Sequence, residues 1–526
     1  MRRWRRSKRR WASNGRRKGA RLPVFYQPGD KEHAMSAWPQ HPLIYEINTW
    51  VWLRELGQQL GEPLTLASVP KSVWDDIASL GFDGVWLMGV WERSPAGIQV
   101  SMANQGLLDD FSRALPDFRA EDNVGSPYCV RNYEVDPCLG GREGLAVARQ
   151  ELASRGLALI LDLVPNHVAP DHPWVTEHPD YFIRGDYGDV MREPASFLTT
   201  GGHVYACGRD PFFPAWPDVL QLNAFDPGLR AAVRETVGSI ADQCDGVRCD
   251  MAMLVMNHIF QRTWGERAGV PPAVDYWPEL IGAVRATHPG FLFMAEAYWE
   301  LEWELQQQGF DFCYDKKLYD RLEHGPAENV RLHLCAEATY QERLVRFIEN
   351  HDEPRAAATF SPEKERAVAL LTTTLPGAAL LHEGQLEGRR VRLPVFLGRR
   401  PAEEVDHKLR AFYQALLVVI AREGVRGGRW RLCERSGWPD NASHLNIVAH
   451  CWSGEKSRHL IVVNLSATAA QARVQLPCEE LRGRTWRLVD LLTAESWDRD
   501  GDEMTGAGLY VDLGPWKCNI FRLEPL

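Results

Sequence analysis

The chain has 526 residues, a formal net charge of −10, 45% hydrophobic residues and 25% charged residues. This length exceeds that of one typical domain, so we expect a large domain and at least one smaller module. The composition excludes a largely disordered chain, the lack of any apolar run of ~18 residues excludes a membrane protein, and the acidic balance makes nucleic acid an unexpected partner.

The N-terminus departs from this balance. Residues 1–22 are dense in arginine and nearly lack aliphatic side chains, so the segment repels itself and is predicted to be disordered. Paired arginines also occur in export signals, but no apolar stretch follows them here. Because Met35 begins the first globular run, we interpret residues 1–34 as a basic, disordered extension, with a tail that binds nucleic acid or a membrane surface as the alternative.

The cysteines indicate the redox environment. Eleven of them are scattered along the chain without the CxxC spacing of a zinc site. No signal peptide is apparent in the sequence. The pattern therefore predicts reduced thiols and a cytoplasmic protein.

Short apolar runs alternate with longer helix-compatible stretches between about residues 41 and 390. This alternation is typical of βα units around a parallel sheet. Eight such runs predict an α/β fold, a TIM (β/α)8 barrel within a catalytic domain over residues 35–425, in which the C-terminal ends of the strands build the site. The predicted strands are 43–47, 84–88, 158–163, 246–248, 291–295, 310–314, 345–348 and 378–381.

Two segments interrupt or follow this rhythm. Residues 168–225, after the third strand, are rich in Pro, Gly, Asp and aromatic residues, and a loop of this length inside a barrel is expected to form a small inserted domain. From about residue 430 apolar and polar residues alternate. Residues 430–526 are therefore predicted to form an antiparallel β-sandwich.

Acidic residues follow three of the predicted barrel strands. Asp250 ends the fourth, Glu296 ends the fifth and Asp352 follows the seventh. One acid at such a position caps a helix as often as it takes part in catalysis, but three that converge on one mouth favour a catalytic site. Arg248 lies two residues before Asp250, on the same side of an extended strand, where its charge would keep Asp250 ionised.

The residue types indicate the chemistry. Cleavage of a glycosidic bond with retention needs a carboxylate nucleophile and a second carboxyl that donates a proton to the leaving oxygen. Two carboxyls this close together titrate as a coupled pair, so one of them can stay protonated near neutral pH.

Four short motifs resemble those of the α-amylase superfamily, glycoside hydrolase family 13, in the same order along the chain. The resemblance extends over about residues 41–526 and implies the barrel, the inserted domain and the terminal sandwich. The motifs are DLVPNH at 162–167, GVRCD at 246–250, AEAYW at 295–299 and ENHD at 349–352.

The resemblance also implies roles for individual residues. It makes Asp250 the nucleophile, Glu296 the general acid/base and Asp352 a third essential carboxylate that holds sugar hydroxyls. His167 and His351 are implied as hydrogen-bond donors to the sugar and Arg248 as the orienting cation.

The segment GSPYCVRNY is similar to the family region that carries a stacking tyrosine, which implies Tyr128 as the sugar platform beside Tyr133, with core packing as the alternative. Asn166 stands where family members often ligate calcium. One amide oxygen does not make a site for an ion that takes six or more oxygens, so calcium is an optional ligand here and no cofactor is expected to be required.

The sequence also departs from the family pattern near the acceptor side. Asp250 is followed by MAMLVMNH in place of a lysine-histidine pair, and Gly125 stands where enzymes that trim single glucose units often have an aspartate. Tyr298, Trp299 and Trp303, which follow Glu296, are candidates for a second sugar platform, with helix packing as the rival explanation for Trp303.

We therefore expect a retaining α-glycosidase that acts on α-1,4-glucan or maltooligosaccharides. The rival with the same site is a transglycosylase or isomerase of maltose, trehalose, sucrose or a sugar phosphate, because water and a sugar hydroxyl compete for the same intermediate. A catalytically inactive carbohydrate-binding protein is the alternative from a different class; it is disfavoured because all three acids are present.

Overall fold

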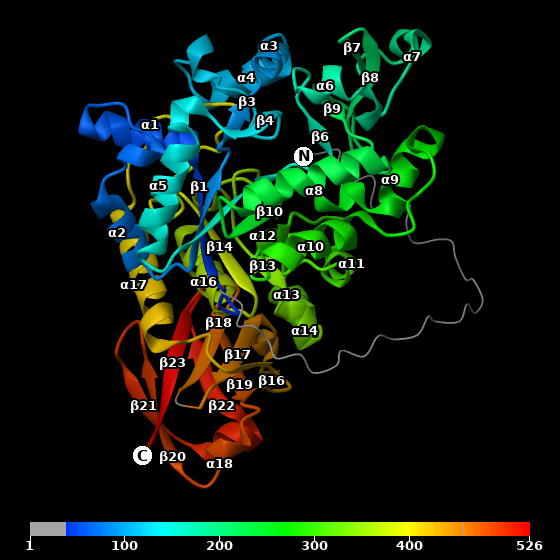
Figure 1. The fold of residues 1–526 in the computed structure, drawn as a ribbon. Coiled ribbons are helices and arrows are strands. Elements are labelled where there is room, and N and C mark those ends of the chain that lie inside the picture. The colour runs from blue at the N-terminus through cyan, green and yellow to red at the C-terminus, as the bar shows by residue number, and fades with distance from the viewer. Residues whose placement is uncertain (1–37, 456) are drawn as a thin grey trace, which may run out of the picture. The chain divides into compact units, whose positions relative to one another are not determined.

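The computed structural model describes residues 38–455 and 457–526. The predicted N-terminal extension, residues 1–34, lies outside the described residues. Eight parallel strands close into a barrel in the order β1-β14-β13-β12-β11-β10-β5-β2, which confirms the predicted TIM barrel (Figure 1). All eight predicted strands are present, although β12 and β13 are shorter than predicted. The barrel strands are β1 Leu43–Asn48, β2 Gly84–Met88, β5 Ala158–Leu163, β10 Gly246–Cys249, β11 Leu292–Ala295, β12 Phe312–Tyr314, β13 Leu344–Arg346 and β14 Ala378–His382.

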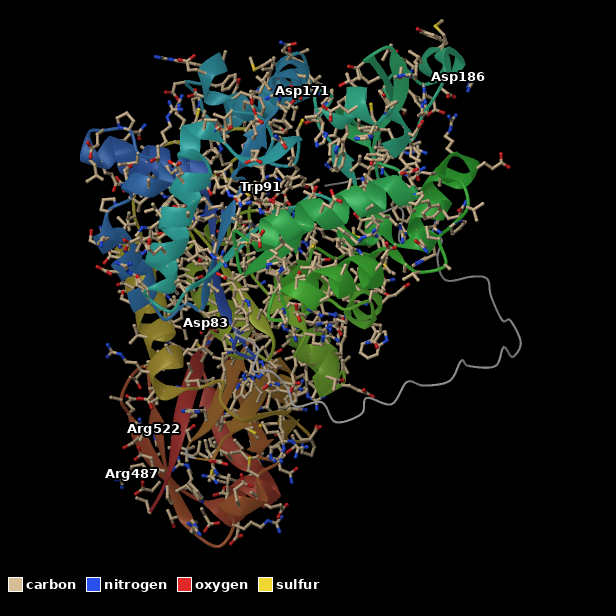
Figure 2. All side chains as sticks on the ribbon, in the orientation of Figure 1. Asp83, Trp91, Asp171, Asp186, Arg487 and Arg522 are labelled. Atoms are coloured by element: carbon tan, nitrogen blue, oxygen red, sulfur yellow. The ribbon has the colours of Figure 1, made fainter. Side chains whose placement is uncertain are left out.

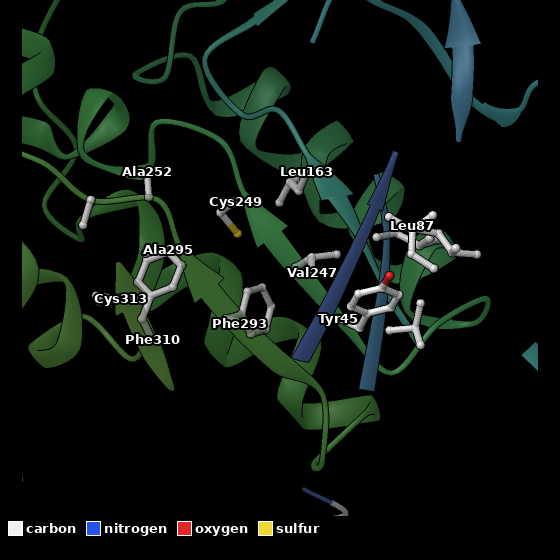
Figure 3. Close-up of a cluster of buried hydrophobic side chains, with 14 of the residues drawn as sticks. Tyr45, Leu87, Leu163, Val247, Cys249, Ala252, Phe293, Ala295, Phe310 and Cys313 are labelled. Carbon is white, nitrogen blue, oxygen red and sulfur yellow. The ribbon is translucent and has the colours of Figure 1, made fainter. Parts of the chain in front are cut away.

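The strands are apolar on both faces because each face is covered. Successive side chains of a strand alternate in direction, so Ile44, Trp86 and Ile160 fill the inside of the barrel. Their neighbours belong to a second cluster that packs under the surrounding helices; Figure 3 shows Val247 and Phe293 in it. This explains why these strands appear in the sequence as continuous apolar runs.

Helices connect most of the barrel strands, and their ends follow local sequence signals. Asp406 caps α17 by accepting hydrogen bonds from Lys408 N and Leu409 N, and Gly424 ends that helix in the left-handed region. The longer helices around the barrel are α1 Thr49–Leu60, α2 Lys71–Ser79, α5 Gly141–Ala153, α8 Pro227–Ala241, α9 Asn257–Trp264, α10 Tyr276–Thr287, α12 Lys316–His324, α13 Ala327–Leu334, α16 Pro362–Thr374 and α17 His407–Glu423. Shorter ones are α11 Glu302–Gln307, α14 Ala338–Gln341 and α15 Ala356–Thr359.

The predicted insertion after β5 contains a four-stranded sheet in the order β6-β9-β8-β7. Asp171, labelled in Figure 2, lies in it and accepts a hydrogen bond of 2.5 Å from Ser94 Oγ, which begins a helix outside the insertion. The insertion is thereby fastened to the wall of the site. Its elements are β6 His167–Val168, α6 Trp174–Glu177, α7 Tyr187–Arg192, β7 Phe197–Thr200, β8 His203–Gly208 and β9 Trp216–Gln221.

The C-terminal strands form two antiparallel sheets, as predicted. Their inner faces share an apolar core that includes Leu460, Val462 and Val474. The side chains of His450 and Trp452 both donate to Thr374 O, at 3.1 and 2.8 Å, and so join this part to α16. The six-stranded sheet contains β15 Arg429–Leu432, β17 Ile447–Ser453, β18 Arg458–Asn464, β20 Thr485–Asp490, β21 Ser496–Asp500 and β23 Cys518–Pro525; the other contains β16 Glu434–Ser436, β19 Ala470–Gln475 and β22 Leu509–Leu513, with the short α18 Gly501–Glu503 between β21 and β22.

A brace on one side of the barrel mouth was not predicted. It consists of the strand pair β3 Trp91–Arg93 and β4 Val130–Val135, with α3 Pro95–Met102 and α4 Gln105–Ala114 between them. The loop after β14 packs on α4 through Leu397 and Phe396, and Arg399 binds both carboxylate oxygens of Asp122 at 2.6 and 2.8 Å. The brace therefore fixes the segment that leads to Tyr128.

Two global features bear on the sequence predictions. Among the described residues, no helix combines the length and the apolar character needed to cross a membrane. The eleven cysteines are all free thiols, although Cys451 Sγ and Cys478 Sγ lie only 3.7 Å apart.

The start of the loop after β14 is held by a buried relay. His382 N donates to Gln385 Oε1 at 3.1 Å, and Gln385 Nε2 contacts Tyr413 OH at 3.0 Å. Tyr413 in turn donates to Glu365 Oε1 at 3.2 Å. Burial raises the pKa of Glu365 to about 8, so the relay includes a neutral carboxyl at physiological pH.

The pKa of Glu365 leads to a prediction on stability. Since its pKa is higher in the folded than in the unfolded chain, Glu365 stabilises the fold at low pH and loses this contribution as the pH rises through about 8. Replacement Glu365→Gln should leave Tm nearly unchanged at pH 5 and raise it by about 2 °C at pH 9, relative to wild type. Differential scanning calorimetry at both pH values measures this difference, and an equal change at both would contradict it.

Candidate active site

One buried arginine connects two of the three predicted acids. Arg248 Nη1 donates to Asp250 Oδ1 at 2.7 Å, and Arg248 Nη2 lies 2.9 Å from Glu296 Oε2, a charge contact without hydrogen-bond geometry. The arginine side chain is fully buried, and those of Asp250 and Glu296 are 8% and 3% exposed. The sequence predicted the first contact; the second makes the same cation the anchor of both acids.

Aromatic rings hold this cation in place. The guanidinium carbon lies 5.1 Å from the ring centre of Tyr128, 5.3 Å from that of Trp86 and 5.7 Å from that of Tyr314. Ring faces attract cations and exclude water. The charge of Arg248 is therefore directed at the two carboxylates.

Glu296 has the properties of a proton donor. Burial raises its pKa to about 7, against the opposing charge of Arg248. Met251 N donates to Oε2 at 2.7 Å and Tyr298 OH donates to Oε1 at 2.9 Å, which fix the orientation of the carboxyl. Burial also raises the pKa of Asp250, and there the hydrogen bond from Arg248 acts in the opposite direction. One of the two acids can thus be protonated while the other is ionised.

The surroundings of Asp352 shift its pKa in the opposite direction. His351 Nε2 is 3.0 Å from Asp352 Oδ2. Burial would raise the pKa of Asp352, but the charge of His351 holds it below its usual range. The Asp352 side chain is 43% exposed, so it is free to accept hydrogen bonds from a ligand.

The two predicted histidines differ in charge. Burial lowers the pKa of His167 to about 4, so this ring is neutral; it lies 5.3 Å from the ring of Trp216. Burial would also lower the pKa of His351, but the carboxylates of Asp352 and Glu46 raise it to about 10. Of these two histidines, only His351 therefore brings a positive charge to the site.

Tyr128 and its predicted neighbour have different surroundings. The Tyr128 hydroxyl is 2.6 Å from His351 Nε2, and its ring is half-buried against Arg248. The Tyr133 hydroxyl instead binds the main chain of Val164, at 2.9 and 3.1 Å. Tyr128 thus stands at the mouth, whereas Tyr133 is a structural residue.

The surroundings of Asn166 do not fit a calcium ion. Its Oδ1 accepts from Gln221 Nε2 at 2.9 Å and its Nδ2 donates to Gln221 Oε1 at 3.2 Å. Both side chains are buried, so each amide already has its partner in the other. Within residues 38–455 and 457–526 there is also no cluster of three or more His, Cys, Asp or Glu residues suited to a metal, while Ca²⁺ requires six or more oxygen ligands.

Strained backbone lies on the other side of Glu296. Met251, Trp299 and Glu300 have φ of 42°, 61° and 65°, in the left-handed region that residues other than glycine rarely adopt. This conformation brings the Trp299 ring to 4.9 Å from that of Phe212, which lies in the loop between β8 and β9 of the insertion. Phe212 is itself 44% exposed, so the pair forms an aromatic wall whose Trp299 follows Glu296 by three residues.

The remaining aromatic candidate does not join that wall. Trp303 lies on α11 with half of its surface exposed, and its ring faces Tyr340 at 6.2 Å. The prediction that Trp303 packs with its helix thus explains it better than a sugar platform.

Residues that sequence reasoning missed also surround the acids. Glu46 contacts His351, and Arg392 Nη1 donates to Asp352 O at 2.7 Å. Tyr298 was predicted as part of a sugar platform, but its hydroxyl donates to Glu296. Glu46 alone carried a signal in the sequence, as a charged residue in the middle of an apolar strand.

The arrangement suits a double displacement at an acetal carbon. An ionised carboxylate and a protonated one, both bound to Arg248, supply a nucleophile and an acid, and the third carboxylate can hold the hydroxyls of a sugar. The neutral His167 and the ring of Tyr128 add a polar and an apolar contact.

Comparison with known sequences finds a matching family profile and similar proteins. A family profile described as the alpha amylase catalytic domain matches residues 72–448. The chain is 26% identical over 387 residues to an alpha-amylase of Haloarcula japonica, covering 70% of this chain and 47% of that protein. It is 28% identical over 232 residues to an alpha-1,4-glucan:maltose-1-phosphate maltosyltransferase of Rhodospirillum rubrum, covering 42% and 27%. The match thus spans about half of the length of the first of these relatives and less of the second.

Solved structures show the same fold. A maltogenic alpha-amylase of Thermotoga neapolitana aligns with a TM-score of 0.67 at 17% identity, over 93% of this chain and 99% of that one. An alpha-amylase of Geobacillus thermoleovorans, complexed with acarbose, aligns with a TM-score of 0.63 at 15% identity, over 92% and 98%. At these identities the likeness concerns the fold alone.

The pKa of Glu296 predicts the pH dependence of a reaction at this site. Since the acid must be protonated, kcat/KM should fall on the alkaline side with an apparent pKa of about 7. Glu296→Gln should remove this limb and lower kcat/KM for oligosaccharides by about 10²–10⁴-fold. α-Glucosyl fluoride should lose much less, because fluoride leaves without a proton. An alkaline limb that persists in Glu296→Gln would refute the assignment.

Asp250 should be indispensable for turnover. Asp250→Asn keeps the shape of the side chain but removes the nucleophilic charge, so kcat should fall by about 10³-fold or more. The matched control is Asp242→Asn, which changes an exposed acid on the C-terminal side of α8 and should keep full activity. Both variants should show wild-type circular dichroism; appreciable activity in folded Asp250→Asn argues against a nucleophilic role.

Proposed function

The chain belongs to the alpha-amylase family, and we propose that it cleaves α-1,4-glucosidic bonds of glucans or maltooligosaccharides by double displacement. The observation that carries this proposal is the placement of Asp250 and Glu296 on one buried guanidinium, Arg248. The raised pKa of Glu296, about 7, supports its role as the acid.

The proposed reaction has two steps. Asp250 attacks the anomeric carbon while Glu296 transfers its proton to the leaving glycosidic oxygen, which gives a glucosyl ester on Asp250. In the second step Glu296 accepts a proton from water, and the resulting hydroxyl displaces Asp250. Asp352 accepts hydrogen bonds from hydroxyls of the reacting sugar, and the half-buried ring of Tyr128 covers its apolar face.

The names of the relatives support this substrate class. One is an alpha-amylase, another is an alpha-1,4-glucan:maltose-1-phosphate maltosyltransferase, and a structural neighbour is complexed with acarbose. We therefore propose that the glycosyl donor of this chain is also an α-glucan.

Transfer to a sugar acceptor is the second candidate. It is favoured by the aromatic wall of Phe212 and Trp299, because Trp299 follows Glu296 by only three residues. An apolar surface at the acceptor position favours a pyranose over water. The maltose, trehalose, sucrose and sugar-phosphate reactions predicted from the sequence all belong to this candidate.

Location and cofactors are part of the same proposal. The free thiols of all eleven cysteines support a cytoplasmic enzyme, since such thiols persist in a reducing compartment. The amide pair of Asn166 and Gln221 supports activity without calcium.

Maltoheptaose tests both candidates in one experiment. Shorter oligosaccharides alone, with a rise in reducing ends, indicate hydrolysis; products longer than the substrate, formed together with shorter ones, indicate transfer; and no product from folded enzyme at any pH overturns both. If transfer occurs, Phe212→Ala should lower the ratio of transfer to hydrolysis by about fivefold, since it removes one stacking face. Trp303→Ala, on the exposed surface of α11, is the control and should leave the ratio unchanged. Product analysis by anion-exchange chromatography gives the ratio.

The same assay separates the enzyme from an inactive binding protein. That alternative predicts calorimetric binding of acarbose by the wild type without any release of products from maltoheptaose. Turnover by the wild type that Asp250→Asn abolishes excludes it.

A further inference from the structure

We propose that Glu46 is a positioning residue that keeps His351 doubly protonated, and that this charge makes Asp352 an acceptor and the Tyr128 hydroxyl a donor towards the bound sugar. The consequence for the sugar rests on the function proposed above. The charge of His351 itself does not depend on that function, and it can be measured separately.

Glu46 is built into the barrel at the height of the site. It faces inward from β1, two residues after Ile44 of the barrel core, and its register neighbours are Trp86 on β2 and His382 on β14. The side chain is fully buried. A charge at such a position needs a compensating partner.

His351 is that partner. Its ring nitrogen Nδ1 contacts Glu46 Oε1, and its main-chain N–H donates to the same oxygen at 3.4 Å. The imidazole packs edge-on against Trp86, with ring centres 5.4 Å apart. Glu46 therefore fixes both the position and the rotation of the ring.

The two ring nitrogens contact two different carboxylates. Nδ1 contacts Glu46, and Nε2 lies 3.0 Å from Asp352 Oδ2. A neutral imidazole has only one N–H, so one nitrogen would place its lone pair against a carboxylate oxygen. Only the imidazolium, with a proton on each nitrogen, satisfies both contacts.

The protonation of His351 decides what Tyr128 does. The Tyr128 hydroxyl oxygen is 2.6 Å from Nε2. When Nε2 carries a proton, this oxygen accepts from it while Asp352 makes a charge contact with the same ring, and the hydroxyl proton of Tyr128 is available to a ligand. When Nε2 is bare, the hydroxyl must donate to it, and the site loses one donor and the cation beside Asp352.

Other charges around the ring do not replace Glu46. Arg248 is a second cation and opposes protonation of His351, whereas burial lowers the pKa of His382 to about 3 and keeps that ring neutral. Asp162 is occupied by Trp86 Nε1 at 3.1 Å and Gly89 N at 2.6 Å. The titratable and charged groups around His351 are Glu46, Asp352, Tyr128, His382 and Asp162, together with Arg248, which packs on the same Trp86 and Tyr128 rings.

The direct test is an NMR titration of His351 in full-length protein labelled with ¹⁵N-histidine. The signal is assigned by its loss in His351→Gln. In the wild type both ring nitrogens should keep imidazolium shifts from pH 5 to 9. In Glu46→Gln the ring should titrate within this range, because its pKa falls by about two units or more. Glu46→Asp, which keeps the charge one methylene further away, should shift the pKa only part of the way.

The kinetic test separates positioning from mere structural support. The ratio of wild-type to Glu46→Gln kcat/KM on maltoheptaose should be smallest at pH 5, where the negative charge of Asp352 is enough to keep the ring protonated. It should grow to about ten- to hundredfold at pH 8. Asp242→Asn removes the charge of an exposed acid outside the barrel mouth, and its ratio should show no such trend.

Each possible result either supports or overturns the proposal. A wild-type His351 that titrates near pH 6–7, or one that stays protonated in Glu46→Gln, overturns the proposal. A kinetic deficit of Glu46→Gln that is the same at every pH shows a structural role only. If Glu46→Gln does not fold, the same pH comparison is made with Glu46→Asp. If the wild type lacks activity, the titration still reports the charge of His351, so failure of the proposed function is distinguished.

Discussion

The site depends on the burial of one positive charge. Arg248 is fully buried at the end of β10, and its desolvation is compensated by Asp250 and Glu296 and by the ring faces of three aromatic residues. Two acids bound to one cation cannot relax independently. The guanidinium therefore fixes their geometry, while the low polarity around it keeps Glu296 able to hold a proton near pH 7.

A second set of charges is organised in the opposite way. His351 is a cation between the carboxylates of Glu46 and Asp352. Arg248 is a cation that contacts Asp250 and Glu296, and burial raises the pKa of both. The same ions in the same barrel mouth thus produce a carboxyl ready to donate and a carboxylate ready to accept. The difference arises from the balance at each group: burial outweighs the charge of Arg248 and raises the pKa of Glu296, whereas the charge of His351 outweighs burial and lowers the pKa of Asp352.

The strands and the three acids could be predicted from the sequence because both follow from local rules. Strands that are buried on both faces appear as apolar runs, and the ends of parallel strands meet at one mouth, which placed Asp250, Glu296 and Arg248 correctly. Contacts between distant segments leave no such pattern. The pairing of Asp122 with Arg399 and of Phe212 with Trp299 joins loops whose lengths and compositions are irregular, and Glu46 stood out only as a charge within an apolar strand.

The backbone around the acids adopts conformations that its residue types disfavour. Met251 follows the nucleophile candidate and Trp299 and Glu300 follow the acid, and all three adopt left-handed φ values, which cost about 1–3 kcal/mol each in residues with a Cβ. Met251 in this conformation points its N–H at Glu296 Oε2, so the strain at one acid orients the other. Trp299 in the same conformation meets Phe212. The strained backbone that follows the two acids thus connects Glu296 to the Asp250 segment on one side and to Phe212 of the insertion on the other.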